Sequence, residues 1–106
     1  MKRGSLYSGL PAAVKRERFE TLLRTRSVKI ERIVSRGQST PAGEWLKGHK
    51  GEWVLLLKGS ATLRFKRGDR VVRMKPGDHI SIPAGQAHRV ERTATGRSTI
   101  WLAVHC

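Results

Sequence analysis

The sequence predicts an all-β fold, a sandwich, jelly roll or small barrel that follows one short N-terminal helix. Two observations favour this fold. Short apolar or alternating runs recur from residue 27 to the end of the chain, and Gly or Pro separates most of them, as is typical of strands joined by turns. The stretch 76–88 is the clearest case, because a tight turn, an alternating strand and a proline that ends regular pairing follow one another there.

The length and composition of the chain limit its organisation. With 106 residues it is one domain, residues 1–106, with a helix at about 11–24 and the β-rich part at about 28–105. No apolar run approaches the roughly 18 residues of a membrane span, and the first residues lack the apolar core of a secretory signal. The single cysteine, Cys106, excludes an internal disulfide. We therefore expect a cytoplasmic protein with no membrane partner.

The charge of the chain is strongly positive. Lys and Arg total 22 against 8 acidic residues, for a net charge of +14. Such a surface repels cations and concentrates anions. The balance is compatible with a nucleic acid, an acidic surface or an anionic small molecule as partner, and also with a general adaptation of the source's proteins.

The predicted helix and strands follow from residue spacing. Pro11 suits the first position of a helix, and Phe19, Leu22 and Leu23 form a narrow apolar stripe that we expect to pack on a sheet. In the first strand the alternation slips by one near Arg32. Strands are expected at 27–35, 52–58, 61–66, 71–75, 79–82, 88–93 and 99–105.

Three of these strands allow more specific predictions. Residues 52–58 are apolar on both faces, so both faces should be covered. Residues 61–66 and 71–75 form a hairpin with Arg67, Gly68 and Asp69 at its tip. Asp78 is expected to cap its own turn.

Two spaced motifs resemble the signatures of the cupin superfamily. Gly77, Pro83, Gly85 and His88 fit each step of the second signature, and the spacing from Glu52 to Gly59 fits the end of the first. The chain is therefore similar to small single-domain cupins. The resemblance covers roughly residues 28 to 105 and implies a jelly-roll barrel, with the helix as an N-terminal addition.

The resemblance also implies a metal inside the barrel. Many cupins hold it with two His and a Glu from the first signature and one His from the second. Glu52 and His88 lie at matching positions, and His49 lies close to a third, so these three are the candidate metal ligands for Fe, Mn or Zn. The alternative is that His88 bonds a backbone group and Glu52 pairs with a nearby Lys.

This chain departs from the metal-binding pattern at the first signature. Where the resemblance implies two His, the sequence has Gly48 or Lys47 and Leu46 or Trp45. Lys47 and Lys50 also raise the electrostatic cost of a cation in this loop. Metal binding and enzymatic activity therefore remain open at this level, and no catalytic residue is assigned.

Apolar residues near Glu52 and His88 are expected to line a cavity for a small, anionic ligand. On an open-sided metal this arrangement would support isomerase, dioxygenase or hydrolase chemistry. His79 is expected to face outward, and His105 to lie at the surface or an interface. The expected ligand-lining residues are Val54, Leu56, Ile80 and Ile82.

The basic residues of the hairpin suggest a second kind of site. Arg64 and Lys66 share one strand face, Arg73 and Lys75 share another, and an anion would relieve the repulsion between these pairs. The alternative function is therefore a non-catalytic protein that binds nucleic acid or another polyanion. No aromatic side chains are interleaved there to stack on bases. Retention on a polyanion column no stronger than that of an unrelated protein of equal charge would exclude this alternative.

A homodimer is expected from the apolar faces of the strands. Trp53, Leu55 and Leu57 alternate with Glu52 and need cover if Glu52 faces the barrel, and Trp101 and Ala103 raise the same need. A monomer mass by light scattering at micromolar concentration would contradict this expectation.

Overall fold

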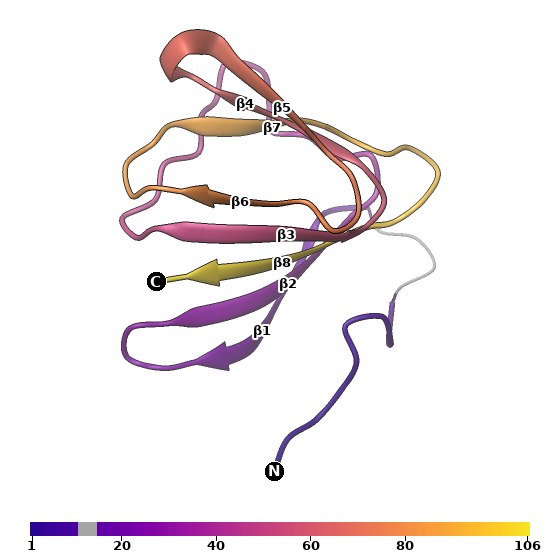
Figure 1. Cartoon of the computed structure of the whole chain (residues 1–106). Helices are drawn as coiled ribbons and strands as arrows, with labels where there is room; N and C mark the ends of the chain where they lie inside the picture. Colours follow the sequence, from indigo (N-terminus) through magenta and orange to yellow (C-terminus); the bar gives the residue numbers. More distant parts are fainter. Residues whose placement is uncertain (11–14) are drawn as a thin grey trace.

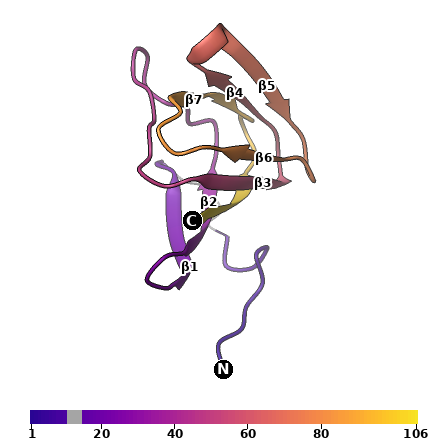
Figure 2. The same cartoon turned by 60° about the vertical axis from the view of Figure 1, so that its left-hand side comes forward.

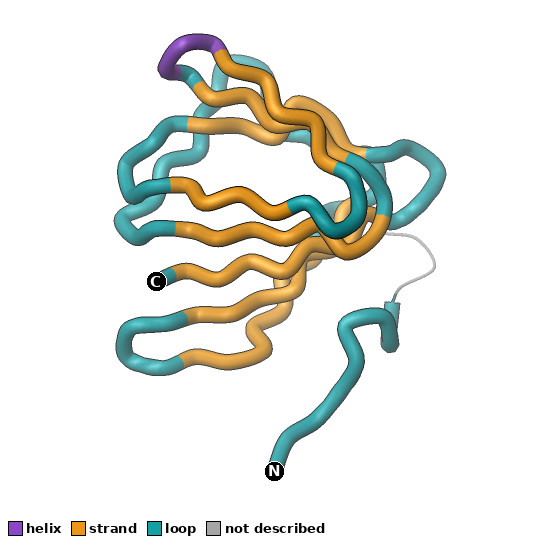
Figure 3. Tube along the Cα trace, in the orientation of Figure 1, coloured by secondary structure: helices purple, strands orange, loops and turns teal. Residues whose placement is uncertain are grey.

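The computed structural model describes residues 1–10 and 15–106, and these residues form eight strands in two sheets. The larger sheet has the order β1-β2-β8-β3-β6, and the smaller has the order β5-β4-β7. Figures 1 and 3 show the smaller sheet lying over the larger, and Figure 2 shows the same two layers from another side. The elements are β1 (Arg18–Arg24), β2 (Lys29–Ser35), β3 (Glu52–Lys58), β4 (Ala61–Phe65), the 3-10 turn η1 (Arg67–Asp69), β5 (Arg70–Met74), β6 (His79–Ile82), β7 (His88–Thr93) and β8 (Thr99–His105).

The prediction of an all-β jelly roll is confirmed, but the N-terminal helix is wrong. Residues 18–24 form β1, an edge strand antiparallel to β2, and residues 11–14 of the expected helix lie outside the described residues. The register of β1 shifts between Thr21 and Leu23. A bulge of this kind adds one residue to a strand, so Phe19, Leu22 and Leu23 imitate helical spacing. The described residues contain no helix long and apolar enough to span a membrane.

The irregularity that the sequence predicted near Arg32, in the strand expected at 27–35, is also wrong. β2 pairs with β8 without interruption from Lys29 opposite His105 to Ser35 opposite Thr99. The alternation only looks disturbed because β2 is covered on both faces. Glu31 is buried toward the barrel interior and Arg32 is buried on the outer face.

The core lies between the two sheets. Leu56 and Trp101 are Cα partners on β3 and β8, and both are buried with Leu63 and Phe65 of the opposite sheet. Trp101 and Ala103 therefore face the interior, and their expected need for a second chain was wrong. Trp53 and its neighbours on the outer face are half-buried, so the homodimer remains a prediction.

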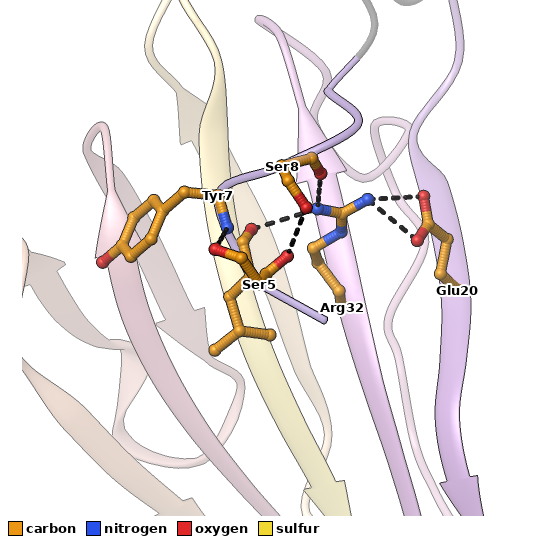
Figure 4. A network of polar contacts seen from close by, with 6 residues as sticks. Ser5, Tyr7, Ser8, Glu20 and Arg32 are labelled. Carbon is orange, nitrogen blue, oxygen red and sulfur yellow. Dashed lines mark hydrogen bonds and ion pairs between the residues drawn. The ribbon is translucent and has the colours of Figure 1, made fainter. Parts of the chain in front are cut away.

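A segment of the N-terminus covers part of the outer face of the large sheet. The Arg32 guanidinium donates through Nη1 to the carbonyl oxygens of Leu6 (3.0 Å) and Ser8 (2.6 Å), and through Nη2 to both carboxylate oxygens of Glu20 at 2.8 Å. Figure 4 shows Arg32 between this segment and β1. Tyr7 adds a hydrogen bond from its hydroxyl to the carbonyl of Leu57 at 3.4 Å. Residues 5–8 thus cover part of the outer face of the large sheet, a role that the sequence predicted for an N-terminal helix.

Candidate functional site

A cavity of about 160 Å³ lies between the two sheets. Its walls are mostly apolar and include Ile33, Leu63, Val90 and Trp101. Five ionisable side chains also line it: Glu17, Glu31, Glu52, His88 and His105. An apolar cavity with a few polar groups is the common form of a small-molecule site.

The strand register explains why the ionisable groups gather at one end. Lys29, His105 and Glu52 are successive Cα partners across β2, β8 and β3, and they share the face that points into the barrel. Glu31 lies one inward-facing position further along β2. The next inward position along β3 from Glu52 is Val54, which is buried, so the cavity becomes apolar away from its polar end.

His88 reaches the cavity from the opposite sheet, at the start of β7. Its side chain is buried, 7% exposed, and its ring lies 5.9 Å from the ring of Phe65 between centroids. The Nδ1 atom is 2.9 Å from the carbonyl oxygen of Gln86. A carbonyl only accepts, so Nδ1 carries the proton and Nε2 of the neutral ring is an acceptor. Within the described part of the chain, Nε2 has no hydrogen-bond partner.

Glu52 lies in the same cavity as His88, as the sequence predicted. Its side chain is half-buried, and among the described residues its carboxylate has neither a hydrogen bond nor an ion pair. The alternative interpretation was that His88 bonds a backbone group and Glu52 pairs with a Lys. The first part is confirmed, because His88 bonds the Gln86 carbonyl. The described residues do not show the second part, because no Lys among them pairs with Glu52.

Sequence reasoning missed three further groups in the cavity, Glu17, Glu31 and His105. His105 was expected at the surface, but its Nε2 lies 2.8 Å from Oε1 of Glu31, and Lys29 lies 3.4 Å from the other oxygen of that carboxylate. Glu17 accepts a hydrogen bond from the hydroxyl of Ser35. The signal for His105 was available, because it shares its parity with Trp101, which faces the core.

The expected metal ligands are only partly brought together. His49 is exposed in the loop before β3 and does not line the cavity. In residues 1–10 and 15–106, no group of three or more His, Cys, Asp or Glu side chains is placed to hold a metal ion. Leu46 pairs with His88 through an isolated bridge and lines the cavity, and it is one of two residues, Leu46 or Trp45, at which the resemblance implies a His. The set His49, Glu52 and His88 therefore remains a prediction.

The expected ligand-lining residues divide into two groups. Val54 and Ile82 line the cavity beside Glu52 and His88. Leu56 is fully buried in the core, and Ile80 packs against the core without lining this cavity.

We expect Leu56→Ala to lower the free energy of unfolding by about 2–5 kcal/mol, because it empties part of a packed core. Leu56 is 0% exposed, whereas Leu23 on β1 is 52% exposed. Leu23→Ala is therefore the matched control, with an expected loss below about 0.5 kcal/mol. Urea denaturation followed by Trp fluorescence measures both. Equal losses would mean that Leu56 is not a core residue.

The sequence matches a family described as "Cupin domain" over residues 33–105. This span is more than half of the chain. The chain belongs to the cupin family. The two cupin signatures, identified first by their spacing, accordingly supply the two free polar groups of the cavity, Glu52 and His88.

Solved structures of other proteins agree with this fold. A proposed mannose-6-phosphate isomerase from Ralstonia eutropha JMP134 is 40% identical, with a TM-score of 0.96 over 100% of this chain and 98% of that one. A cupin superfamily protein from Desulfitobacterium hafniense DCB-2 is 19% identical, with a TM-score of 0.77 over 99% and 91%. The polyketide cyclase RemF from Streptomyces resistomycificus is 23% identical, with a TM-score of 0.76 over 99% of this chain and 78% of that one. At this identity the similarity indicates a shared fold and nothing about activity. No curated protein matched the sequence.

Most of the basic residues of the hairpin have partners within the chain. Arg64 donates through Nη1 to Asp69 at 2.6 Å and through Nε to Glu91 at 2.9 Å, and these bonds raise the pKa of its guanidinium. Lys66 lies over the ring of Trp45, 5.9 Å from its centroid, and Lys75 lies 3.6 Å from Asp78. Three of the four expected anion ligands thus already have partners, and anion binding by Arg64, Lys66, Arg73 and Lys75 remains a prediction.

Two smaller expectations on the second signature are confirmed. His79 is exposed, and its ring lies 5.5 Å from that of Trp53 on the outer face. Asp78 accepts a hydrogen bond from the backbone N–H of Lys75 at 2.9 Å, so it caps the turn before β6. Both residues therefore serve the fold rather than the cavity.

Proposed function

We propose that this cupin binds a small organic molecule inside its barrel, held between Glu52 on β3 and His88 on β7. One observation carries the proposal. The two side chains come from opposite sheets, line the same cavity and have no side-chain partner among the described residues. His88 is buried and Glu52 is half-buried, and polar groups removed from water are normally paired, so a ligand is the natural partner for both.

The same two groups are suited to proton transfer. An imidazole and a carboxylate that line one cavity are common general acid and base groups of enzymes. With Nδ1 held by the Gln86 carbonyl, Nε2 of His88 is the atom that takes or returns a proton. A bound molecule with an acidic C–H or O–H beside Nε2 could therefore be isomerised, which extends the proposal from binding to catalysis.

The substrate of the Ralstonia relative is not part of the proposal. That protein is named for mannose 6-phosphate, whose phosphate is an anion. The cavity of this chain is lined by three carboxylates. The expectation of an anionic ligand rests on the net charge of +14 and on Lys47 and Lys50 near His49, and neither lysine lines the cavity.

A divalent metal is the cofactor that the resemblance implies, and the described residues fit it incompletely. Glu52 and His88 would supply two ligands, but catalytic sites generally use three protein ligands. The resemblance implies a His at Leu46 or Trp45, of which Leu46 lines the cavity, and His49 does not line it. The proton transfer proposed for His88 uses only the imidazole and needs no metal-bound group.

Binding is tested with a neutral probe and the metal-free protein. We expect cyclohexylmethanol to shift the amide NMR signals of Val54, Ile82 and His88. His88→Ala should weaken this binding by about tenfold, since one hydrogen bond is lost. His79→Ala is the matched control, because His79 is exposed outside the cavity. No shift at the cavity signals with this or any charged analogue of the probe would refute the proposed function.

Metal content is tested on protein purified without an affinity tag and incubated with Fe(II), Mn(II) or Zn(II). We expect less than about a tenth of an equivalent after dialysis, because only two ligands are present. One full equivalent in the parent that is lost in both Glu52→Ala and His88→Ala would instead establish a metal centre.

A further inference from the structure

The two free polar groups of the cavity are both hydrogen-bond acceptors. The Glu52 carboxylate offers only lone pairs, and the Gln86 carbonyl holds the His88 proton on Nδ1, which leaves a lone pair on Nε2. The His88 residue is 7% exposed and lines the cavity, so the lone pair on Nε2 is available to a molecule inside it. A ligand that satisfies both groups must therefore bring donors.

The charges around the cavity indicate the kind of donor. Three of the chain's eight acidic residues line it, and no Lys or Arg among the described residues does. Glu31 is paired with His105 and Lys29, and Glu17 accepts from the hydroxyl of Ser35. Among the described residues, the half-buried Glu52 carboxylate has no ion-pair partner. Removing a charge from water is costly unless it is paired.

We propose that the ligand is an organic ammonium cation with an apolar body, whose N–H groups bond Glu52 and Nε2 of His88. This inference rests on the proposed function and names the chemical class of its ligand. The apolar body would lie against Ile33, Val54 and Trp101, which line the same cavity. The volume of about 160 Å³ suits a single ring or a short branched chain.

Two other occupants fit these observations less well. A carboxylate or phosphate would place acceptors against acceptors beside an unpaired Glu52. A metal ion would find Glu52 and His88, but no group of three or more His, Cys, Asp or Glu side chains in the described residues is placed to hold one. The net charge of +14 opposes a cation at long range, but salt at physiological strength screens that effect beyond about 8 Å. Contacts inside the cavity then decide affinity.

The test compares three probes that share one apolar body and differ in charge. Cyclohexylmethylamine, cyclohexylmethanol and cyclohexanecarboxylate are titrated into the full chain near neutral pH, in chelator-treated buffer, with the cavity amide signals followed by NMR. We expect the amine to bind at least about tenfold more tightly than the alcohol, because a charge-assisted hydrogen bond is stronger than a neutral one. The carboxylate should bind most weakly.

Two variants assign the preference to the cavity. Glu52→Gln keeps the shape and removes the charge, and it should bring the amine to within about threefold of the alcohol. Glu44→Gln removes the same charge from an exposed loop residue outside the cavity, and it should leave the preference unchanged. A thermal melt of each variant confirms that it is folded.

The outcomes separate this inference from the proposed function. Cavity shifts in which the alcohol or the carboxylate binds as tightly as the amine would overturn the ammonium ligand and leave small-molecule binding intact. A preference that survives Glu52→Gln would overturn it as well. Cavity shifts with Zn(II) at a one-to-one ratio that the amine cannot reverse would assign the site to a metal. No shift with any probe would remove both the inference and the proposed function.

Discussion

Gly59→Ala should lower the free energy of unfolding by about 4 kcal/mol or more, which places it among the exceptional single substitutions. Gly59 joins β3 to β4 with a φ of +90°, a conformation that residues with a Cβ rarely adopt. A Cβ built there would lie 2.4 Å from Oγ1 and 2.7 Å from Cα of Thr99, and 2.9 Å from the carbonyl oxygen of Ser98. Because two of these atoms are backbone, the turn cannot relax by rotating a side chain.

Gly96→Ala is the matched control for this substitution. Gly96 also has a positive φ, +73°, but nothing lies within 4 Å of its built Cβ. Its expected cost is about 1–2 kcal/mol from backbone strain alone. Urea denaturation measures the difference between the two variants. Similar losses would show that the approach to β8 is not the cause, and that Gly59 is required only for its turn.

Arg32→Ala should lower the free energy of unfolding by about 2–3 kcal/mol. Arg32 is 5% exposed, and its removal leaves the carbonyl oxygens of Leu6 and Ser8 without their donor and Glu20 without its counter-charge. Breaking a buried pair costs about 3–5 kcal/mol. The expected value is smaller, because Glu20 is 34% exposed and the Arg32 Nε already lacks a partner among the described residues.

The Arg32 prediction has a local readout as well as a global one. The amides of Tyr7 and Ser8 bond to Ser5, and hydrogen exchange at both should accelerate when residues 5–8 lose their anchor. Arg24→Ala removes an exposed arginine from β1 and should change stability by less than about 0.5 kcal/mol. Equal stability of the two arginine variants, with unchanged exchange at Tyr7, would show that Arg32 does not anchor this segment.

Local chemistry made much of the fold predictable from the sequence. Gly59, Gly77 and Gly85 all have positive φ, so their spacing between alternating runs indicated where strands end. The second signature placed β6 and the start of β7 correctly, and it identified His88 as a residue of the barrel interior. These features depend on a few neighbouring residues, which is why one sequence was sufficient to find them.

The N-terminal strand depended on a partner far along the chain. Phe19, Leu22 and Leu23 fit a helix when only their spacing is considered. Pairing with β2 and a bulge after Thr21 make the same residues a strand. The cover on the outer face of β2 is equally non-local, because the Arg32 anchor joins it to residues 24 and 26 positions earlier.

The sequence alone determined that Glu52 and His88 belong to one barrel interior, because each lies in a motif whose spacing is defined along the chain. Only the tertiary structure decided what accompanies them. The register of β8 between β2 and β3 brings His105 beside Glu52 and within 2.8 Å of Glu31, and the same register turns Trp101 into the core. Register is a property of paired strands, so the sign of the charge inside the cavity could not be obtained from a net charge that counts mainly the outer surface.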